Sequence, residues 1–357
     1  MRGPPLGHRD PMRIAITGAS GNVGSAVVDR LLQDGHDLVG IVRRPPEDDR
    51  LEWRRVDLSD VAQMPDLQRA VQGADAVVHL AWGFQPSHRI GYLAALGVGG
   101  TRRVVEAVVR AGVPHLVHQS SVGAYSPRVD RSPVTEDFPT EGVWSSPYSR
   151  HKVAAERILD RFEDRLTMTR MRPGIIGQRR AASGLLRYGV PLLVPGRLVR
   201  RVPVLPLEDV VQISMVHAHD VADAIARAID RRASGAFNLA AGSLDVDEIA
   251  DVLGARRVPF PMPVLRAAAA ATWRLRLQPV DPGWIDLARH APVLDASRAR
   301  HELGWTPTRS ARQVLEEVVD GMVHADAGDT EVLRRRTVPR EVGTLLRRGP
   351  VSSRTRP

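Results

Sequence analysis

Two patterns of hydrophobic and polar positions alternate along the chain from residue 13 onward. Short apolar runs are typical of buried parallel strands, and longer segments repeat their apolar residues at helical spacing. This alternation predicts an α/β fold in which a parallel sheet carries helices on both faces. The strands are expected at 13–17, 37–43, a short stretch ending at Val56, 76–81, 115–119 and 166–171, and the helices at 22–33, 90–111 and about 148–164.

The regular alternation stops after residue 178. Residues 179–213 are rich in Arg, Leu, Pro and Gly, and 243–322 are predicted to be mostly helical. A helix at 220–231 and a strand at 236–239 indicate a late return to the sheet. We expect a disordered leader at 1–12, a nucleotide-binding domain at 13–178 with 214–242 returning to it, a smaller, mostly helical substrate domain at 179–213 and 243–325, and a basic, disordered tail at 326–357.

A glycine-rich turn follows the first predicted strand. Its sequence, Thr17-Gly18-Ala19-Ser20-Gly21-Asn22-Val23-Gly24, places three glycines at a spacing of three between a strand and a helix. The first glycine permits a tight turn, the second lets the backbone approach a pyrophosphate, and the third lets the helix pack closely on the strand. In this context the turn predicts dinucleotide binding, with a purely structural turn as the alternative.

The end of the second predicted strand bears on which dinucleotide is bound. Proteins that bind NAD usually have an acidic residue here to bind the ribose, whereas this chain has Arg43 and Arg44. A guanidinium suits the 2′-phosphate of NADP, so NADP is favoured over NAD, although one Arg among 49 can also be accidental. Asp57, after the third strand, is either an acceptor for the adenine amino group or the cap of the next helix.

A tyrosine and the only lysine of the chain are four residues apart in a predicted helix. Of 50 basic residues 49 are Arg, and the single Lys152 shares a helix face with Tyr148. A nearby ammonium should lower the phenol pKa, so that the tyrosine can exchange a proton with a substrate oxygen while a hydride moves at carbon. Ser121, at the end of a strand, can orient that oxygen. Two solvated residues and a turn-forming serine pair are the alternatives.

Together these residues resemble the extended short-chain dehydrogenases/reductases of the NAD(P)-dependent epimerase/dehydratase family. The resemblance covers roughly residues 13–320 and rests on motifs that are weak singly and specific jointly. They are the Thr17–Gly24 turn, Asp57-Leu58, His79-Leu80-Ala81, Gly100-Thr101, Ser120-Ser121 with Tyr125, Tyr148-x-x-x-Lys152, Arg172-Pro173-Gly174, Val216-His217 with Asp220-Val221-Ala222, and Leu303-Gly304-Trp305-x-Pro307.

The resemblance implies a Rossmann-type doubly wound sheet, a C-terminal substrate domain, and catalytic roles for Ser121, Tyr148 and Lys152. The implied enzyme is an oxidoreductase that transfers hydride between a nicotinamide cofactor and an alcohol/carbonyl pair on a small molecule. One alternative is a nucleotide-sugar epimerase or dehydratase with tightly bound NAD, and another is a non-catalytic NAD(P)-sensing protein. The expected cofactor contacts are Gly18, Ser20, Gly21, Asn22, Val23, Gly24, Arg43, Arg44, Asp57, Leu58, Leu80, Ala81, Tyr148, Lys152 and Pro173.

Three departures from the family pattern bear on these expectations. The family often has Asn in the helix before Gly-Thr, where it completes a proton relay, and this chain has Gly97. The relay must then use water or another route, or activity is reduced. The residue after Ala81 is Trp82, which is bulky near the cofactor. The tail after about residue 325 has no counterpart in the family.

Charge and composition narrow the class of partner. The net charge is +9, but residues 329–357 contribute +5 and residues 1–12 contribute +1, which leaves +3 for residues 13–328. A folded part so close to neutral predicts no nucleic-acid partner. No stretch approaches the roughly 20 apolar residues of a membrane span, and the N-terminus does not resemble a signal peptide. We expect a cytoplasmic protein, with a homodimer as one option.

No metal site is expected. The chain lacks Cys, and His217-Ala218-His219-Asp220 is interpreted as two structural histidines before a helix N-cap at Asp220. Arg179-Arg180 and Arg200-Arg201 are interpreted as solvated surface rather than a phosphate site. The least patterned segments should form the substrate pocket, and their Leu, Val, Pro and Trp content favours an apolar substrate over a sugar nucleotide. They are 82–96, 179–213 and 255–290.

Overall fold

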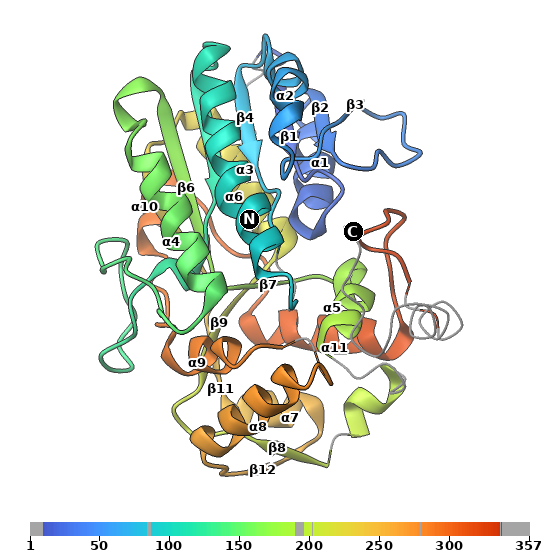
Figure 1. The fold of residues 1–357 in the computed structure, drawn as a ribbon, viewed down its shortest axis with the longest axis vertical. Coiled ribbons are helices and arrows are strands. Elements are labelled where there is room, and N and C mark those ends of the chain that lie inside the picture. The colour runs from blue at the N-terminus through green and yellow to red at the C-terminus, as the bar shows by residue number, and fades with distance from the viewer. Residues whose placement is uncertain are drawn as a thin grey trace.

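The central element is a seven-stranded sheet in which every neighbouring pair is parallel (Figure 1). The strand order is β10-β6-β5-β4-β1-β2-β3. The order reverses between β1 and β4, and in open α/β sheets ligands bind at such a point, beyond the carboxyl ends of the strands. The strands are β1 Arg13–Thr17, β2 Asp37–Val42, β3 Glu52–Arg55, β4 Ala76–His79, β5 His115–Gln119, β6 Thr167–Pro173 and β10 Gly235–Leu239.

The computed structural model places helices on both faces of this sheet. Successive side chains of a strand point to opposite faces, so Ile14 and Ile16 pack with α1 and α6 in one core, and Ala15 packs with α2, α3 and α4 in the other. The predicted doubly wound α/β fold is therefore confirmed. The flanking helices are α1 Asn22–Gln33, α2 Met64–Val71, α3 Ile90–Arg110, α4 Pro147–Asp160 and α6 Ala218–Arg231. The structure describes residues 10–83, 87–189, 196–201, 203–278, 280–335 and 337.

The later segments form a second, smaller layer below the carboxyl ends of the sheet (Figure 1). A three-stranded sheet of β7 Ile175–Gly177, β9 Gln212–His217 and β11 Ser243–Asp245 has the order β11-β9-β7, and β8 Val204–Pro206 pairs with β12 Arg256–Val258. The helices of this part are α5 Ala182–Gly189, α7 Val246–Leu253, α8 Met262–Arg274, α9 Gly283–His290, α10 Ser297–Leu303 and α11 Ala311–His324. Short 3₁₀ turns lie at Val61–Gln63, Val122–Ala124, Glu163–Arg165, Arg179–Ala181 and Gly196–Arg201.

Two strand ends differ from the sequence expectation and matter for the site. β4 ends at His79, two residues before the predicted end, so Leu80 and Ala81 belong to the loop beyond the sheet edge. β2 ends at Val42, so Arg43 also lies beyond the edge. Residues 1–9 of the predicted leader and 338–357 of the predicted tail lie outside the described residues.

Candidate active site

The glycine turn connects β1 to α1 and is crowded by the backbone on its inner side. Gly18 has φ +74°, and a Cβ at this position would lie 2.8 Å from the amide nitrogen of Ala81. A Cβ at Gly24 would lie 2.1 Å from the carbonyl oxygen of Gly18. A side chain at either glycine would therefore collide with backbone. The predicted reasons for the first and third glycines, a tight turn and close helix packing, match this geometry.

The N-terminus of α1 opens toward the carboxyl end of the sheet without a side-chain cap. Gly21 is the N-cap residue and supplies no side-chain hydrogen bond to the first turn. First-turn N–H groups need an outside acceptor, and together with the helix dipole they favour an anion. The side chain of Asn22 is engaged elsewhere, since it accepts a 2.8 Å bond from Gln178 and donates to the Ile176 carbonyl. Asn22 and the buried Val23 can therefore meet a cofactor mainly through backbone N–H groups.

Arg43 and Arg44 lie just beyond β2 and have different surroundings. Nη1 of Arg43 donates a 2.8 Å bond to the Tyr92 hydroxyl. Nε of Arg43 is buried and has no partner among the described residues. Arg44 is more exposed and forms a 3.7 Å ion pair with Glu331. Arg43 thus retains a buried donor at the place where the sequence predicts a cofactor phosphate.

Asp57 and Leu58 close the loop after β3. Oδ1 of Asp57 accepts bonds from the backbone N–H of Ser59 at 2.9 Å and from its hydroxyl at 2.6 Å. The cap of the next helical turn is Asp60, which accepts from Ala62 at 3.0 Å. The alternative that Asp57 caps this helix is wrong, because the cap, Asp60, lies three residues later. Leu58 is buried, and its carbonyl accepts a 2.9 Å bond from Arg103.

A C-terminal segment, residues 326–335, lies against the glycine turn. The Thr330 hydroxyl donates a 2.8 Å bond to the carbonyl of Ser20, and Leu333 is buried. The same segment carries Glu331, the partner of Arg44. Two of the predicted cofactor residues, Ser20 and Arg44, therefore contact residues about 300 positions away in the sequence.

Loops after β4, β5 and β6 bring further predicted residues to the same sheet edge. The backbone N–H groups of Leu80 and Ala81 donate to the carbonyl and hydroxyl of Thr17, at 3.1 and 3.3 Å. Pro173 is the last residue of β6 and pairs in register with Leu239 of β10. Because all these strands are parallel, their ends meet the glycine turn along one edge.

Helix α4 presents Tyr148 and Lys152 toward the end of β5. The helix begins at Pro147, and the Ser146 hydroxyl caps it by accepting from Ser149 at 3.4 Å. The side chain of Tyr148 is hydrogen-bonded to Ser121, whose hydroxyl also accepts a 3.0 Å bond from the backbone of Gly123. The structure thus brings Ser121 and Tyr148 into contact, and Lys152, one turn further along α4, donates a 2.8 Å bond to the Gln119 carbonyl at the end of β5.

Burial shifts the pKa values of Tyr148 and Lys152. Burial raises the pKa of Tyr148 to about 12, although the hydrogen bond with Ser121 opposes the shift. Burial lowers the pKa of Lys152 to about 7, with the Glu156 carboxylate acting in the opposite direction. The sequence-based expectation was a lowered phenol pKa. That direction is wrong for this structure, because desolvation outweighs any effect of the ammonium.

Two tryptophans flank the Tyr148 ring. The Trp82 ring meets it edge-on, with centroids 6.3 Å apart and an interplanar angle of 83°. The Trp284 ring, at the start of α9, stacks on it at 5.1 Å and 30°. The sequence named the segment of Trp284 as a pocket wall but did not single out this residue, since nothing local in the sequence distinguishes it from a core tryptophan.

A buried ion pair links α4 to β6 next to the site. Glu156 of α4 receives two bonds from Arg172 of β6, at 3.0 and 2.6 Å, and a third from the Ser120 hydroxyl. Burial alone would raise the pKa of Glu156, but the bonds from Arg172 and Ser120 outweigh it and lower the pKa. Ser120 and Ser121 therefore differ in role, since only Ser121 contacts Tyr148.

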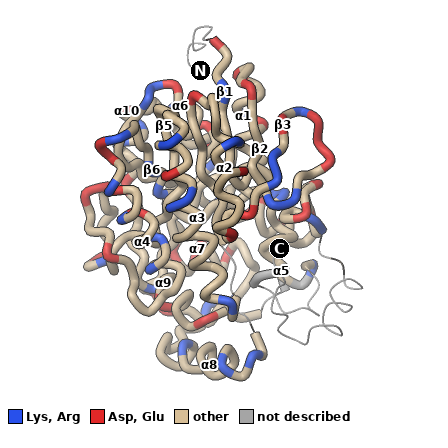
Figure 2. Tube along the Cα trace, turned by 45° about the horizontal axis from the view of Figure 1, so that its top comes forward, with Lys and Arg blue, Asp and Glu red and all other residues tan. Residues whose placement is uncertain are grey.

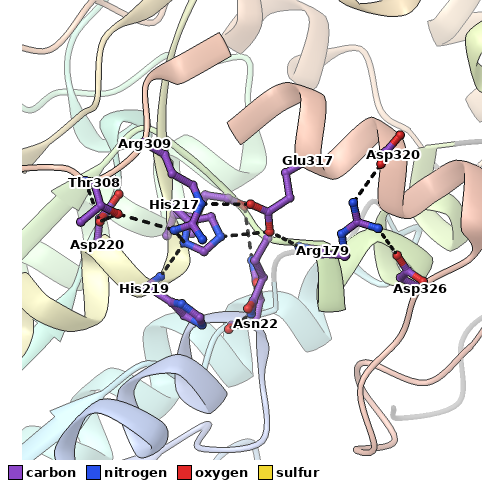
Figure 3. Close-up of polar contacts among 12 residues, drawn as sticks. Asn22, Arg179, His217, His219, Asp220, Thr308, Arg309, Glu317, Asp320 and Asp326 are labelled. Carbon is purple, nitrogen blue, oxygen red and sulfur yellow. Dashed lines mark hydrogen bonds and ion pairs between the residues drawn. The ribbon is translucent and has the colours of Figure 1, made fainter. Parts of the chain in front are cut away.

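The His217-Ala218-His219-Asp220 motif lies at the start of α6. His217, not Asp220, is the N-cap of α6, and its Nδ1 accepts a 3.1 Å bond from the backbone of His219 (Figure 3). The predicted cap at Asp220 is wrong because the helix begins at Ala218, so Asp220 lies inside its first turn and binds Thr308. Nε2 of His217 lies 3.2 Å from Glu317.

A surface cavity of about 410 Å³ lies beside this motif rather than at Tyr148. Its cations are paired with acids, since Arg179 contacts Asp320 and Asp326, and Arg309 contacts Glu317 (Figure 3). The cavity is therefore no ready site for an anion.

The described part of the chain bears on the expectations about charge, membrane spans and metal sites. Basic and acidic residues are interspersed along its Cα trace (Figure 2). No helix in the described part is long and apolar enough to cross a membrane. The described residues also contain no group of three or more metal-binding side chains.

Comparisons with known sequences agree with this geometry. The family model described as the NAD dependent epimerase/dehydratase family matches residues 14–240. An uncharacterised protein of Mycobacterium tuberculosis is 29% identical over 311 residues, which is 86% of this chain but 29% of that protein's length. A 3-diazoavenalumate denitrifying reductase of a Streptomyces species is 28% identical over 326 residues, covering 83% of this chain and 96% of that one. A UDP-glucose 4-epimerase of Mycolicibacterium smegmatis is 32% identical over 166 residues, covering 43% and 52%.

Solved structures support the fold. WbmG of Bordetella bronchiseptica, in complex with NAD, aligns with a TM-score of 0.67 and 22% identity over 91% of this chain and 97% of that chain. MoeE5, in complex with UDP-glucose and NAD, aligns with a TM-score of 0.66 and 22% identity over 87% and 99%. With the family model covering well over half of its residues, the chain belongs to the NAD-dependent epimerase/dehydratase family.

Proposed function

We propose that the protein is an NAD(P)-dependent oxidoreductase that interconverts a carbonyl and an alcohol on a small molecule through Ser121, Tyr148 and Lys152. The observation that carries this proposal is the hydrogen bond between Tyr148 and Ser121 beside the buried ammonium of Lys152. Two hydroxyls beyond the carboxyl end of β5, at the sheet edge where ligands bind in open α/β folds, are suited to bind one substrate oxygen between them.

Tyr148 and Ser121 have separate tasks in this proposal. Tyr148 has a pKa of about 12, so at neutral pH it carries its proton and can donate it to a carbonyl oxygen as that oxygen becomes an alkoxide. This direction, reduction, suits the protonation state of the site. Ser121 orients the same oxygen by hydrogen bonding. A bound nicotinamide cofactor would supply the hydride.

The residues around the turn fit a dinucleotide. The uncapped N-terminus of α1 can hold the pyrophosphate, and the buried Nε of Arg43 offers a donor to a further phosphate. Arg43 and Arg44 support NADP over NAD in our proposal. The two neighbours described above were solved with NAD, so the preference has to be measured on this protein.

An apolar, planar substrate suits the walls of the site. Trp82 and Trp284 place two indole rings against Tyr148, and such rings contribute apolar area and stacking. The similarity to a 3-diazoavenalumate denitrifying reductase supports a reductase rather than a sugar-nucleotide enzyme.

Replacement of Tyr148 by Phe tests the mechanism. The Tyr148→Phe variant should lose turnover by about 10² to 10⁴-fold, the usual contribution of a positioned proton donor. Its affinity for NADPH, followed by fluorescence titration, should stay unchanged. Unchanged turnover would contradict the assignment of Tyr148.

The two adjacent serines provide a matched comparison. Ser121→Ala should lower turnover because its hydroxyl contacts Tyr148, and its cost in thermal stability should be limited to the lost bond from the Gly123 backbone. Ser120→Ala should instead lower thermal stability, because its hydroxyl contacts the buried Glu156. Equal loss of turnover in both variants would argue against a specific role for Ser121.

A nucleotide-sugar epimerase or dehydratase is the second candidate, favoured by the similarity to a UDP-glucose 4-epimerase. Such an enzyme keeps NAD bound through its cycle. Denaturing the purified protein and assaying the released nucleotide separates the two candidates. Stoichiometric NAD would favour the epimerase or dehydratase, and an empty site that binds NADPH reversibly would favour the reductase. Binding of NADPH with no turnover of any carbonyl substrate would favour a cofactor sensor.

A further inference from the structure

The indole of Trp82 lies over the ammonium of Lys152. The Nζ atom is 3.6 Å from the ring centroid, which is the geometry of a cation–π contact. The same ammonium donates one 2.8 Å hydrogen bond, to the backbone carbonyl of Gln119. Lys152 is 3% exposed, so its ammonium is largely shielded from water.

Gly97 makes room for this indole. A Cβ at position 97 would lie 3.0 Å from two ring carbons of Trp82 and 3.2 Å from a third. Any larger side chain at this position of α3 would meet the six-membered ring. The two unusual residues of the site, Gly97 and Trp82, are therefore in contact, and the absence of a side chain at one permits the bulk of the other.

We propose that Trp82 is a positioning residue for Lys152, that its indole face holds the ammonium in place, and that Gly97 is required because any side chain there would displace the ring. The catalytic importance of this arrangement rests on the function proposed above, but its existence does not. At the position where the family often has the Asn of a proton relay, this chain has Gly97, and the Trp82 ring packs over the Lys152 ammonium.

The charged groups around Lys152 compensate its buried charge only in part, so the indole also contributes. Among the described residues, the titratable groups that interact electrostatically with the ammonium are Glu156 on α4, His79 on β4 and His118 on β5. Glu156 is engaged by Arg172 and Ser120, and burial keeps the pKa values of both histidines far below neutrality. The π face of Trp82 therefore compensates the charge together with Glu156 and the Gln119 carbonyl.

The single lysine allows a direct test without any substrate. Labelling the protein with [ε-¹³C]lysine gives one side-chain signal, from Lys152. We expect a ring-current shift of this signal in the native protein and its loss in Trp82→Leu. The measured pKa of Lys152 should fall by about one unit in Trp82→Leu and by less in Trp82→Phe. Trp144→Phe is the matched control, since Trp144 is 81% exposed, and should leave the signal unchanged.

Fluorinated tryptophan separates the π contact from simple packing. Fluorine weakens the negative potential of the ring face with little change in shape, so the pKa of Lys152 should fall stepwise with the number of fluorines. The Trp82→Phe variant grown on the same analogue carries the other five tryptophans and serves as the control. A lysine pKa that is insensitive to fluorination, or that rises in Trp82→Leu, would overturn the proposal.

A second pair of variants tests the role of Gly97. Gly97→Ala should change the ring-current shift of Lys152, because the indole must move by a few tenths of an ångström to accommodate the Cβ, although Ala itself is the better helix former. Gly91→Ala is the matched control in the same helix, because nothing lies within 4 Å of a Cβ there. In the Trp82→Leu background, Gly97→Ala should have no further effect on Lys152. Additive effects of the two substitutions would overturn the coupling.

The outcomes keep the two proposals apart. If Tyr148→Phe retained full turnover while the lysine signal behaved as expected, the proposed function would fail and the Trp82 contact would stand. If Tyr148→Phe lost turnover while Lys152 ignored Trp82, the positioning role would fail and the proposed function would stand.

Discussion

Lys152 and Tyr148 have pKa values shifted by burial in directions that favour their neutral forms. The pKa of the lysine is lowered to about 7, and that of the tyrosine is raised to about 12. In both cases desolvation is the largest cause. A phenol that keeps its proton is a better acid than base at neutral pH, and this favours reduction of a carbonyl over oxidation of an alcohol.

The lowered lysine pKa predicts a specific dependence of stability on pH. Between the folded value of about 7 and the ordinary value of 10.5, the unfolded chain binds a proton at Lys152 that the folded chain has released. The free energy of unfolding therefore rises with pH in this window. Relative to Lys152→Met, the native protein should gain on the order of 3 kcal/mol between pH 7 and pH 10. Urea unfolding at both pH values measures this, and a pH-independent difference would contradict the shift.

At the scale of elements, Glu156 joins α4 to the strands beneath it. Its carboxylate contacts Arg172 of β6 and Ser120 at the end of β5. Arg172 also donates a 3.1 Å bond to the Tyr125 hydroxyl, which in turn donates a 2.6 Å bond to Asn238 of β10. This buried chain of bonds fixes the helix that carries Tyr148 and Lys152.

Loss of the Glu156 charge should destabilise the fold. Glu156→Gln leaves Arg172 buried without its counter-charge, and breaking one side of such a pair costs about 3 kcal/mol. Glu163→Gln is a matched control, because Glu163 pairs with Arg170 but is 57% exposed, and it should change stability by less than about 1 kcal/mol. Thermal or urea unfolding of the two variants should differ accordingly; similar losses would mean that the Glu156 pair adds little.

The elements that could be predicted from the sequence are those with a strong local pattern. The bounds of β1, α1 and β5 agree with the predicted 13–17, 22–33 and 115–119. β7, β8, β11 and β12 have three residues each, too few to show a period. β9 has six residues but owes its pairing to two of these short strands.

Candidate site residues divide in the same way. Ser121, Tyr148 and Lys152 could be proposed from the sequence because their spacing and residue types suit the chemistry. The effect of burial on their pKa values could not, since desolvation depends on packing from other elements. The contacts of Trp82 with Gly97 and of Ser20 with Thr330 join distant parts of the chain and leave no local signal.

At the scale of the whole molecule, later segments complete a site that begins at the first strand. Trp284 of α9 stacks on the ring of Tyr148, and Trp273 of α8 stacks on His88 at 4.8 Å and 11°. Residues 326–335 lie against the glycine turn through Thr330 and Glu331. The proposed cofactor and substrate sites are thus built from both ends of the chain.

Glu331 should influence the choice between the two nicotinamide cofactors. Its carboxylate pairs with Arg44, near the place expected for the 2′-phosphate of NADP, and should repel that phosphate. Glu331→Gln should therefore strengthen NADPH binding by about two- to fivefold, the range of an exposed ion pair, and leave NADH binding unchanged. Titration with both cofactors measures this. An equal gain for both would point instead to easier access at the turn.

Because its only lysine is buried, the folded molecule presents no ε-amine to solvent. Reagents that acylate amines can reach Lys152 only when the surrounding structure opens. The rate of its acylation therefore reports the free energy of local opening around the site. In a protein with many lysines such a rate mixes several positions, whereas here it comes from one position. By the same reasoning, enzymes that attach acetyl groups or ubiquitin to surface lysines find no lysine to modify unless the protein unfolds.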